Sequence, residues 1–265
     1  MFYKSKVLPK VWDDFELMIR DNYSYDEEND VILLGSYLKE NIQSIRDKFP
    51  GKKLIIYQLE PLVSDHWWST DRILNRIRGV DEVWDYDIEN VNIIGSYKIP
   101  VKYRPFRYSE SLKRIDNIPD PDIDVLFYGT LNERRLNILN SFLRPHFSKI
   151  KFVFLSNLLG DELDHFIARS KIILSLNAHD NDRQKQSRIF YPVINNKCVI
   201  SEKSNVNYFG DLIIEADLKS LPIVIMDFLK NEKWKGYSNV SERYWDFCKS
   251  PGKMLELPGA DHSII

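Results

Sequence analysis

The feature that most constrains the fold of this chain is a strand–helix alternation that runs twice along its 265 residues. Short apolar runs, such as residues 31–35 and 53–57, alternate with segments whose apolar residues have helical spacing. A stretch with two prolines, residues 118–122, interrupts the pattern, which restarts at residues 124–128. Buried strands joined by helices form parallel sheets covered on both faces. The sequence therefore predicts an α/β chain with two facing Rossmann-like domains, 1–118 and 119–265.

The same pattern predicts the individual elements. We expect strands at residues 31–35, 53–57, 82–85, 101–103, 124–128, 151–155, 172–176 and 198–200. We expect helices at residues 36–49, 67–78, 89–94, 132–143, 161–169, 184–195, 218–229 and 238–248. An acidic pair, Asp13 and Asp14, is typical of a solvated helix start. Ligands bind at the carboxyl ends of strands in such folds, so polar residues at those ends are the candidates for a site.

Composition excludes several classes of protein. The chain has 37 basic and 39 acidic side chains, so no overall charge recruits a polyanion. Two cysteines are too few for a disulfide scaffold, which favours a reducing cytoplasm. No apolar run approaches the roughly 20 residues that span a bilayer, and the first residues do not resemble a signal peptide. These observations predict a soluble cytoplasmic protein.

The segment after the linker has the chemistry of an anion site. A strand leads into Gly129, then Asn132, and then a helix whose first turn carries Arg134 and Arg135. Guanidinium groups donate paired hydrogen bonds to phosphate oxygens, so these residues predict a phosphate or diphosphate site. The alternative is a surface helix with two solvated arginines. In either case, we expect both arginines to lie at the surface.

A second polar segment follows the strand at 172–176. Each of its residues taken alone is explained as well by a structural role, but together they lie at strand ends and a helix start, where ribose hydroxyls and phosphates bind. The candidate donor-binding residues are Asn177, His179, Arg183, Gln186, Arg188, Ser201 and Glu202.

These motifs carry a resemblance. Residues 124–204 resemble the nucleotide-binding domain of GT-B glycosyltransferases, with a Phe-Tyr-Gly-x-x-Asn-x-Arg-Arg opening, an Asn-x-His strand end, an Arg-Ile helix and a strand ending in Ser-Glu. The resemblance implies a nucleotide-sugar donor, UDP-sugar favoured, with the arginines near its diphosphate. It also implies a C-terminal helix that crosses back to the first domain. Gln186 departs from the glutamate that many relatives use for the ribose.

The first domain should bind the acceptor. Glu60, Asp65 or His66 could remove a proton from an acceptor hydroxyl, although Asp65 is equally suited to a helix N-cap. Trp67 and Trp68 follow directly and could stack on a ring or anchor the helix to the core.

Basic residues in the same half raise the possibility of a DNA acceptor. One helix carries Arg72, Arg76 and Arg78. A second cluster contains Lys98, Lys102, Arg104, Arg107, Lys113 and Arg114. Such a stripe could follow a phosphate backbone, and the alternative is ordinary solvated surface. The resemblance extends to small phage glycosyltransferases that modify hydroxymethylated cytosine, including arabinosyltransferases. It therefore implies double-stranded DNA with this base as the leading acceptor, followed by a glycan or lipid-linked sugar.

A metal site is a weaker interpretation. Asp85 and Asp87 imitate the Asp-x-Asp of GT-A glycosyltransferases, but that motif recurs twice more and a GT-A chain has no restart in mid-sequence. We therefore assign both to strand-end and capping roles. We expect no metal and no cofactor besides the nucleotide sugar as co-substrate. We further expect a monomer or weak dimer. The contrasting hypothesis is a nucleotide-binding module without transfer activity.

Overall fold

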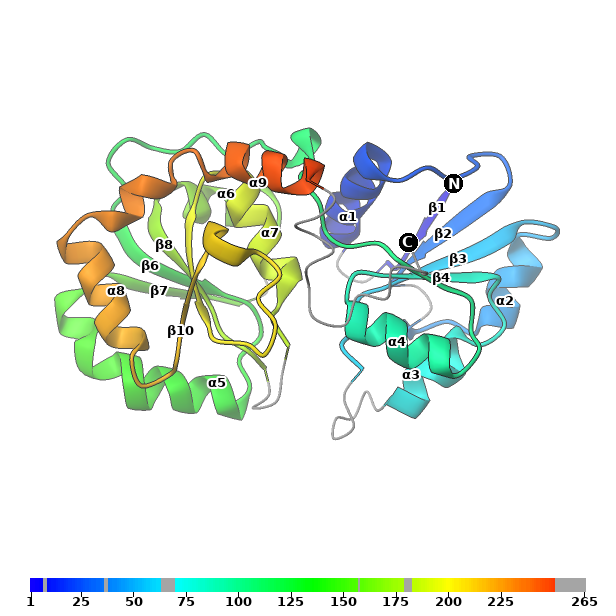
Figure 1. Cartoon of the computed structure of the whole chain (residues 1–265), viewed down its shortest axis with the longest axis horizontal. Helices are drawn as coiled ribbons and strands as arrows, with labels where there is room; N and C mark the ends of the chain where they lie inside the picture. Colours follow the sequence, from blue (N-terminus) through cyan, green and yellow to red (C-terminus); the bar gives the residue numbers. More distant parts are fainter. Residues whose placement is uncertain (7–8, 36–37, 63–69, 157, 179–182, 251–265) are drawn as a thin grey trace. The chain divides into compact units, whose positions relative to one another are not determined.

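The computed structural model describes residues 1–6, 9–35, 38–62, 70–156, 158–178 and 183–250. The chain divides into two compact units, one from Met1 to Phe106 and one that begins at Arg107 (Figure 1). Each unit is built on a five-stranded sheet in which every pair of neighbouring strands is parallel. The prediction of two Rossmann-like α/β domains is therefore confirmed.

The first unit has the strands in chain order, β1-β2-β3-β4-β5. Its elements are β1 (Phe2–Lys4), α1 (Pro9–Asn22), β2 (Asp30–Leu34), α2 (Ile42–Lys48), β3 (Lys53–Gln58), α3 (Thr70–Ile77), β4 (Glu82–Asp85), α4 (Ile88–Ser96) and β5 (Val101–Tyr103). Alternate strand residues such as Leu54 and Ile56 pack against α2, α3 and α4 on one face. Tyr57 points to the other face, where its ring meets that of Phe106 at 6.3 Å between centroids. Apolar residues on both faces explain why these strands are continuous hydrophobic runs.

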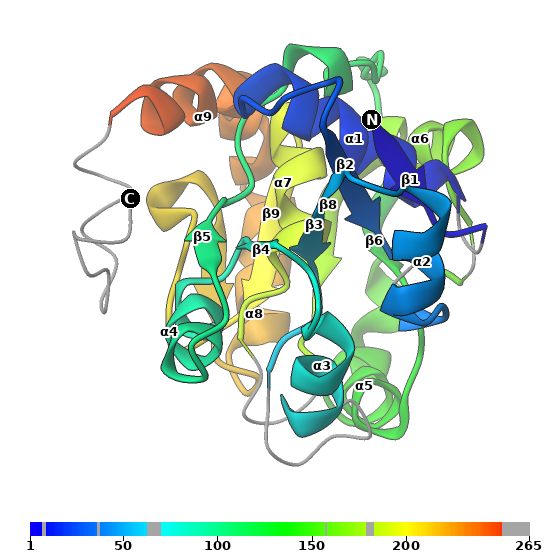
Figure 2. The ribbon, with the colours of Figure 1, turned by 90° about the vertical axis from the view of Figure 1, so that its right-hand side faces the viewer.

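The second unit has the strand order β10-β9-β8-β6-β7. Its strands and α-helices are β6 (Ile123–Tyr128), α5 (Glu133–Ile138), β7 (Phe152–Leu155), α6 (Asp161–Ala168), β8 (Ser170–Ser175), α7 (Gln186–Ile194), β9 (Cys198–Glu202), β10 (Ile214–Ala216), α8 (Leu221–Lys230) and α9 (Val240–Lys249). Short helical turns lie at Glu110–Leu112, Leu139–Leu143, Arg144–Lys149, Gly210–Leu212 and Lys233–Tyr237. α7 packs against β8 and β9 (Figure 2). The strand order reverses between β6 and β8, which creates the topological switch point where open α/β sheets bind ligands.

The boundary between the units lies at residue 106 rather than at residue 118. Residues 107–118 are attached to the second unit, because the Asn195 amide oxygen accepts hydrogen bonds from the backbone N–H groups of Arg114 and Ile115, each at 2.9 Å. Asp122, within the predicted linker, forms an ion pair with Arg169 at 2.7 Å. The proline-rich stretch is therefore part of the second unit and not the connection between the two.

The sequence pattern missed three elements. β1 and β10 are three-residue edge strands, and α1 spans Pro9–Asn22, so Asp13 lies inside this helix and contacts Lys4 instead of marking its start. The expected single helix 132–143 ends at Ile138 and continues as a π-helical turn. α9 packs against α7, while its crossing to the first domain stays a prediction, since residues 251–265 lie outside the described part. Across the described residues, every helix is too short or too polar to cross a lipid bilayer.

Candidate functional site

The predicted donor-binding residues of the second unit gather at the carboxyl edge of its sheet. Gly129 follows β6, Asn177 lies two residues beyond β8, and Glu202 is the last residue of β9. β8 pairs with β6 on one side and with β9 on the other, so these three strand ends are neighbours. The site therefore lies at the topological switch point of the sheet.

Arg134 and Glu202 form a paired contact across this edge. Arg134 Nη1 donates to Glu202 Oε2 at 3.0 Å, and Nη2 donates to Oε1. The backbone of Asn177 joins the same contact, since its carbonyl accepts from Arg134 Nη1 at 3.0 Å and its N–H donates to Glu202 Oε2 at 2.9 Å. The two side chains retain 15% and 7% exposure. Arg134 is thus the partly exposed member of the pair, and Glu202 is buried behind it.

Arg135 has a different role from its neighbour. Its side chain is buried, with the residue 2% exposed, and the prediction of a surface position is wrong. The guanidinium donates to backbone carbonyls, through Nη1 to Thr130 at 2.8 Å and through Nη2 to Leu176 at 2.8 Å. These bonds connect the loop after β6 to the end of β8. Arg135 therefore stabilises the backbone around the site, and unlike Arg134 its side chain is fully buried.

Asn132 and Gly129 complete this frame. Asn132 caps α5 by accepting from the backbone N–H of Arg135 at 3.0 Å, and its amide donates to the Ala178 carbonyl at 2.6 Å. Gly129 has φ +129°, and a Cβ there would lie 2.6 Å from the guanidinium carbon of Arg188. A residue with a side chain would displace Arg188. The glycine thus permits a second guanidinium to pack at the end of β6.

Two buried amide atoms in the site lack a hydrogen-bond partner among the described residues. They are the Oδ1 of Asn177 and the Nε2 of Gln186, the first residue of α7, and each residue is only 2% exposed. A buried polar atom without a partner is unfavourable, and in native proteins it commonly marks the place of an absent ligand or water. These atoms offer one acceptor and one donor next to the arginines.

The remaining predicted donor residues have other positions. Ser201 is buried and its hydroxyl donates to the carbonyl of Glu202 at 3.0 Å, so this side chain is used within the sheet. Arg183 is partly exposed just before α7, and His179 lies outside the described residues.

Gln184 was missed by the sequence analysis. Its amide donates to the Glu215 carboxylate at 3.0 Å and accepts from the backbone of Tyr208 at 3.0 Å, and burial raises the pKa of Glu215. Only packing reveals this role, because nothing distinguishes Gln184 from Gln186 in the sequence.

The first unit uses its strand-end carboxylates internally. Asp85 is fully buried, which raises the pKa of its carboxyl group, and it accepts hydrogen bonds from Gln58 at 3.1 Å, from Asn90 at 3.2 Å and from the backbone of Asp87 at 2.9 Å. Asp87 caps α4 by accepting from the Glu89 N–H at 2.9 Å. The strand-end and capping assignments are confirmed. Within the described ranges, no group of three or more potential metal-binding side chains is found.

This network also shapes the loop after β3, which carries Glu60. The backbone carbonyl of Glu60 accepts from the Asn90 amide at 3.0 Å. The other predicted catalytic and stacking residues, Asp65, His66, Trp67 and Trp68, lie outside the described residues.

The predicted basic stripe is divided between the two units, with Arg104 in the first and Arg107 in the second. Four of its members have local partners. Lys102 forms an ion pair with Glu82 at 3.0 Å, and Arg114 forms one with Asp164 at 3.0 Å. Arg107 donates a hydrogen bond to the Cys248 carbonyl at 3.3 Å. The guanidinium carbon of Arg104 lies 5.3 Å from the ring centroid of Tyr23 and 5.5 Å from that of Trp84. Arg72 and Arg76 lie on α3 as predicted.

No family model and no curated protein matches the chain. Several solved structures have a distant likeness to it. Anabaena Alr3699/HepE, in complex with UDP and glucose, is 7% identical with a TM-score of 0.47, over 92% of this chain and 94% of that one. MurG of Acinetobacter baumannii is 9% identical with a TM-score of 0.41, over 92% and 78%. AviGT4, a glycosyltransferase involved in avilamycin A biosynthesis, is 11% identical with a TM-score of 0.38, over 92% and 88%. At these values the functional conclusion depends on the site itself.

Proposed function

We propose that this protein is a GT-B glycosyltransferase that moves a sugar from a nucleoside diphosphate sugar, UDP-sugar favoured, to an acceptor hydroxyl. The observation that supports this proposal is that two guanidiniums, Arg134 and Arg188, lie at the β6–β8 switch point with two buried amide atoms, on Asn177 and Gln186, that have no hydrogen-bond partner in the described part of the chain. Guanidiniums match the diphosphate, and amides match the hydroxyl and carbonyl groups of a nucleoside.

In this proposal the arginines stabilise the leaving group. The bond between the sugar carbon C1 and the phosphate oxygen breaks, its electron pair passes to the diphosphate, and the acceptor oxygen forms the new bond to C1. Arg134 would exchange its contact with Glu202 for the diphosphate, which leaves the Glu202 carboxylate available to sugar or ribose hydroxyls. A base must take the acceptor proton, and Glu60, Asp65 and His66 stay the candidates for this role.

We propose that turnover requires no metal and no further cofactor, because the guanidiniums supply the positive charge that a divalent ion would otherwise provide. Addition of EDTA should leave initial rates unchanged. A loss of activity that magnesium or manganese restores would contradict this part of the proposal.

The donor site is tested by substituting Arg134. The Arg134→Gln/Glu202→Gln double variant removes the charge pair without leaving an isolated carboxylate, so it should fold. We expect a loss of UDP-sugar binding of about 1.5–3 kcal/mol, the range for charge-assisted hydrogen bonds, measured by calorimetry. Arg144→Gln, an exposed arginine of the same unit, is the matched control. Equal affinity in the parent and the double variant would exclude this site.

The acceptor in the proposal is hydroxymethylcytosine in double-stranded DNA, with a glycan or lipid-linked sugar as the alternative. Support comes from Arg72, Arg76 and Arg78 on and just after α3, and it is weaker than the support for the donor site. The test measures incorporation of labelled sugar into hydroxymethylated and unmodified duplexes, in the parent and in Arg72→Glu. Transfer to a saccharide without any transfer to DNA would exclude the DNA acceptor. Donor that is bound but neither transferred nor hydrolysed would favour an inactive binding module.

A further inference from the structure

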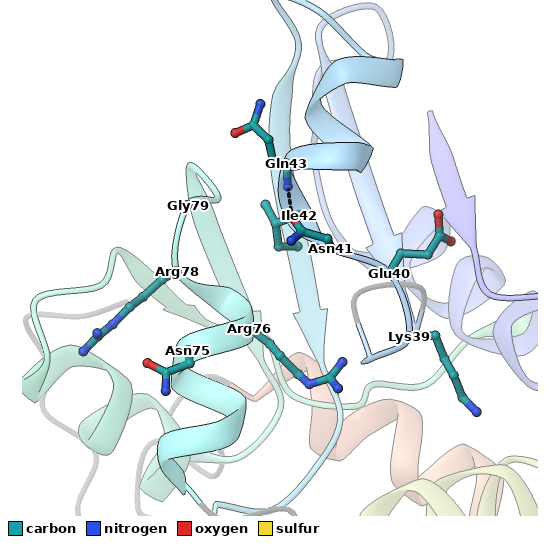
Figure 3. A pocket seen from close by; sticks show the side chains of 9 residues that line it. All are labelled: Lys39, Glu40, Asn41, Ile42, Gln43, Asn75, Arg76, Arg78 and Gly79. Atoms are coloured by element: carbon teal, nitrogen blue, oxygen red, sulfur yellow. Dashed lines mark hydrogen bonds between the residues drawn. The ribbon is translucent and has the colours of Figure 1, made fainter.

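The first unit contains a pocket of about 500 Å³ between the start of α2 and the end of α3 (Figure 3). Figure 3 shows Lys39 and Arg78 directed to opposite sides of this pocket, so they do not converge with Arg76 on one anion. These lining residues therefore do not form an anion site. In the second unit, by contrast, buried side chains beside the proposed donor site form a connected hydrogen-bond network.

Gln184 is the centre of this network. It lies just before α7 and is 1% exposed. Its Nε2 donates to the Glu215 carboxylate on β10 at 3.0 Å and to the side-chain oxygen of Asn207 at 3.1 Å. Its Oε1 accepts from the backbone N–H of Tyr208 at 3.0 Å. Because both amide hydrogens and the oxygen are engaged, the side chain has a fixed orientation and joins three segments of the chain.

Glu215 connects Gln184 to Asn177. The Oε1 of Glu215 also accepts from the backbone N–H of Ser204 at 3.3 Å. The Ser204 hydroxyl accepts in turn from Asn177 Nδ2 at 3.4 Å. This contact directs the nitrogen of the Asn177 amide towards Ser204 and leaves Oδ1 as the buried acceptor that has no hydrogen-bond partner among the described residues. The contacts of Glu215 thus determine which way the Asn177 amide faces.

The backbone of Gln184 leads to the second such atom, the Nε2 of Gln186. The Gln184 carbonyl accepts from the backbone N–H of Gln186 at 2.8 Å, which closes a tight turn at the start of α7. The Gln186 side chain is buried, and its Nε2 has no hydrogen-bond partner in the described part of the chain. Gln184 is therefore connected to both amide atoms of the donor site, to one through its backbone and to the other through its side chain.

We propose that Gln184 and Glu215 are positioning residues that hold the amides of Asn177 and Gln186 in place for the nucleotide part of the donor. This inference rests on the function proposed above. A ligand binds more tightly to groups that are already ordered, because their side-chain freedom is not lost on binding. Without the contact between Gln184 and Glu215, the loop at residues 203–208 and the segment before α7 lose their common support, and the ligand itself has to order both amides.

The experiment is a calorimetric titration of the full chain with UDP. Gln184→Met keeps the length of the side chain and removes its hydrogen bonds, so we expect UDP to bind about fivefold more weakly. Glu215 is only partly buried, and Glu215→Met should give a similar loss even if the first variant does not fold. Glu215→Gln is the conservative rescue. Its side-chain oxygen can still accept from Gln184 and Ser204, so its affinity for UDP should stay within about twofold of the parent.

Asn195→Leu is the matched control for a general loss of stability. Asn195 is likewise a buried amide, 1% exposed, but it lies at the other end of α7, where its oxygen accepts from the backbone of Arg114 at 2.9 Å. Asn195→Leu and Gln184→Met should both lower the melting temperature, because each removes the partner of a buried backbone group. Only Gln184→Met should weaken UDP binding.

Three results would overturn the positioning role. They are equal UDP affinity in the parent, Gln184→Met and Glu215→Met, an equal loss of affinity in Asn195→Leu, and a loss in Glu215→Gln as large as that in Glu215→Met. Each of these results is obtained with a parent that binds UDP, so it leaves the proposed donor site in place. A parent that does not bind UDP contradicts the donor site itself and overturns this inference with it.

Discussion

The carboxyl edges of the two sheets carry similar polar residues and use them in opposite ways. In the first unit, Asp85 is completely buried and its oxygens accept from Gln58, Asn90 and the backbone of Asp87. In the second unit, the Arg134 side chain keeps 15% exposure beside the buried Glu202, and two buried amide atoms close by have no hydrogen-bond partner among the described residues. A polar residue at a strand end is thus no sign of a site by itself. The two edges differ in how far their charged groups are enclosed: Asp85 has no exposed surface, whereas the Arg134 side chain keeps 15% of its surface exposed.

The strand order gives a physical reason for the difference. The first sheet follows the chain order throughout, so no reversal separates neighbouring strand ends. In the second sheet, the chain goes from β6 to β7 on one side of β6 and then to β8 on the other side. The segments that leave β6 and β8 therefore run in opposite directions along the sheet edge. The divergence leaves room for a ligand.

The largest expected effect tests whether Arg135 behaves like Asp85 in the other unit or like Arg134 beside it. Arg135→Ala removes a buried cation that binds backbone carbonyls, so the free energy of unfolding should fall by about 3–5 kcal/mol. Urea denaturation measures this loss. Arg134→Ala is the comparison, with a smaller loss because its side chain is partly exposed. If the Arg135→Ala variant is as stable as the parent, Arg135 does not have the structural role that its buried hydrogen bonds indicate.

Asp85→Ala tests the internal network of the first unit. Its three donors would lose their acceptor in a buried position, so we expect a loss of about 2–4 kcal/mol in the free energy of unfolding. Asp116→Ala, at an exposed aspartate, should change stability by less than about 0.5 kcal/mol. If the two variants unfold alike, Asp85 does not support the loop after β3.

Lys197 extends the comparison to the opposite edge of the second sheet, where a buried cation has carbonyl partners at Ala168 (2.9 Å) and Ser170 (3.2 Å). Burial lowers the pKa of Lys197 to about 8 from 10.5. The folded state therefore releases this proton at lower pH than the unfolded state, and stability rises with pH between these two values.

The parent should gain about 2 kcal/mol, relative to Lys197→Met, between pH 7 and pH 10, as measured by urea denaturation at each pH. Lys171→Met, which removes a lysine paired with Asp124, controls for the general effect of pH on neighbouring charges. If the free energy of unfolding depends on pH in the same way for the parent and for Lys197→Met, the buried lysine does not titrate in this range.

The smallest expected losses of stability come from two glycine substitutions. One strains only the backbone, and the other also displaces the Arg188 side chain. Gly210→Ala places a side chain at φ +55° with no atom within 4 Å, so it should cost about 1 kcal/mol and leave nucleotide-sugar affinity unchanged. Gly129→Ala should cost about 1–2 kcal/mol and additionally weaken nucleotide-sugar binding, because the new Cβ displaces the Arg188 guanidinium. The measurements are thermal unfolding and calorimetry. Identical affinities in the two variants would show that Arg188 does not take part in binding.

Hydrophobic patterning was sufficient to predict the sheets. β4 and β5 have the predicted bounds: polar residues form both ends of β4, and β5 begins directly after Pro100 and ends before Arg104. β1 and β10 are too short for a periodic signal, and each gains its stability from a single neighbouring strand.

The site was predictable only as a set of residue types at strand ends. Arg134 and Arg135 are adjacent and chemically identical, and only the rotation of α5 relative to the end of β8 decides which one is buried. The pocket beside α2 and α3 depends on packing between segments distant in sequence, which no local pattern reveals.

The attachment of residues 107–118 to the second unit has a consequence for the time course of synthesis. The backbone N–H of Tyr108 donates to the sulfur of Cys248, which is 140 positions later in the chain. The backbone N–H of Arg114 donates to the amide oxygen of Asn195, which is 81 positions later. At ribosomal rates of roughly 5–20 residues per second, about 7–30 seconds separate Tyr108 from Cys248. Every strand of the first sheet has been made by then, whereas the bonds of residues 114–117 form only after Asn195 has left the ribosome and that of Tyr108 only after α9 has. A nascent chain arrested before Asn195 should therefore be cleaved by protease within residues 107–118, and a chain released after α9 should resist cleavage there.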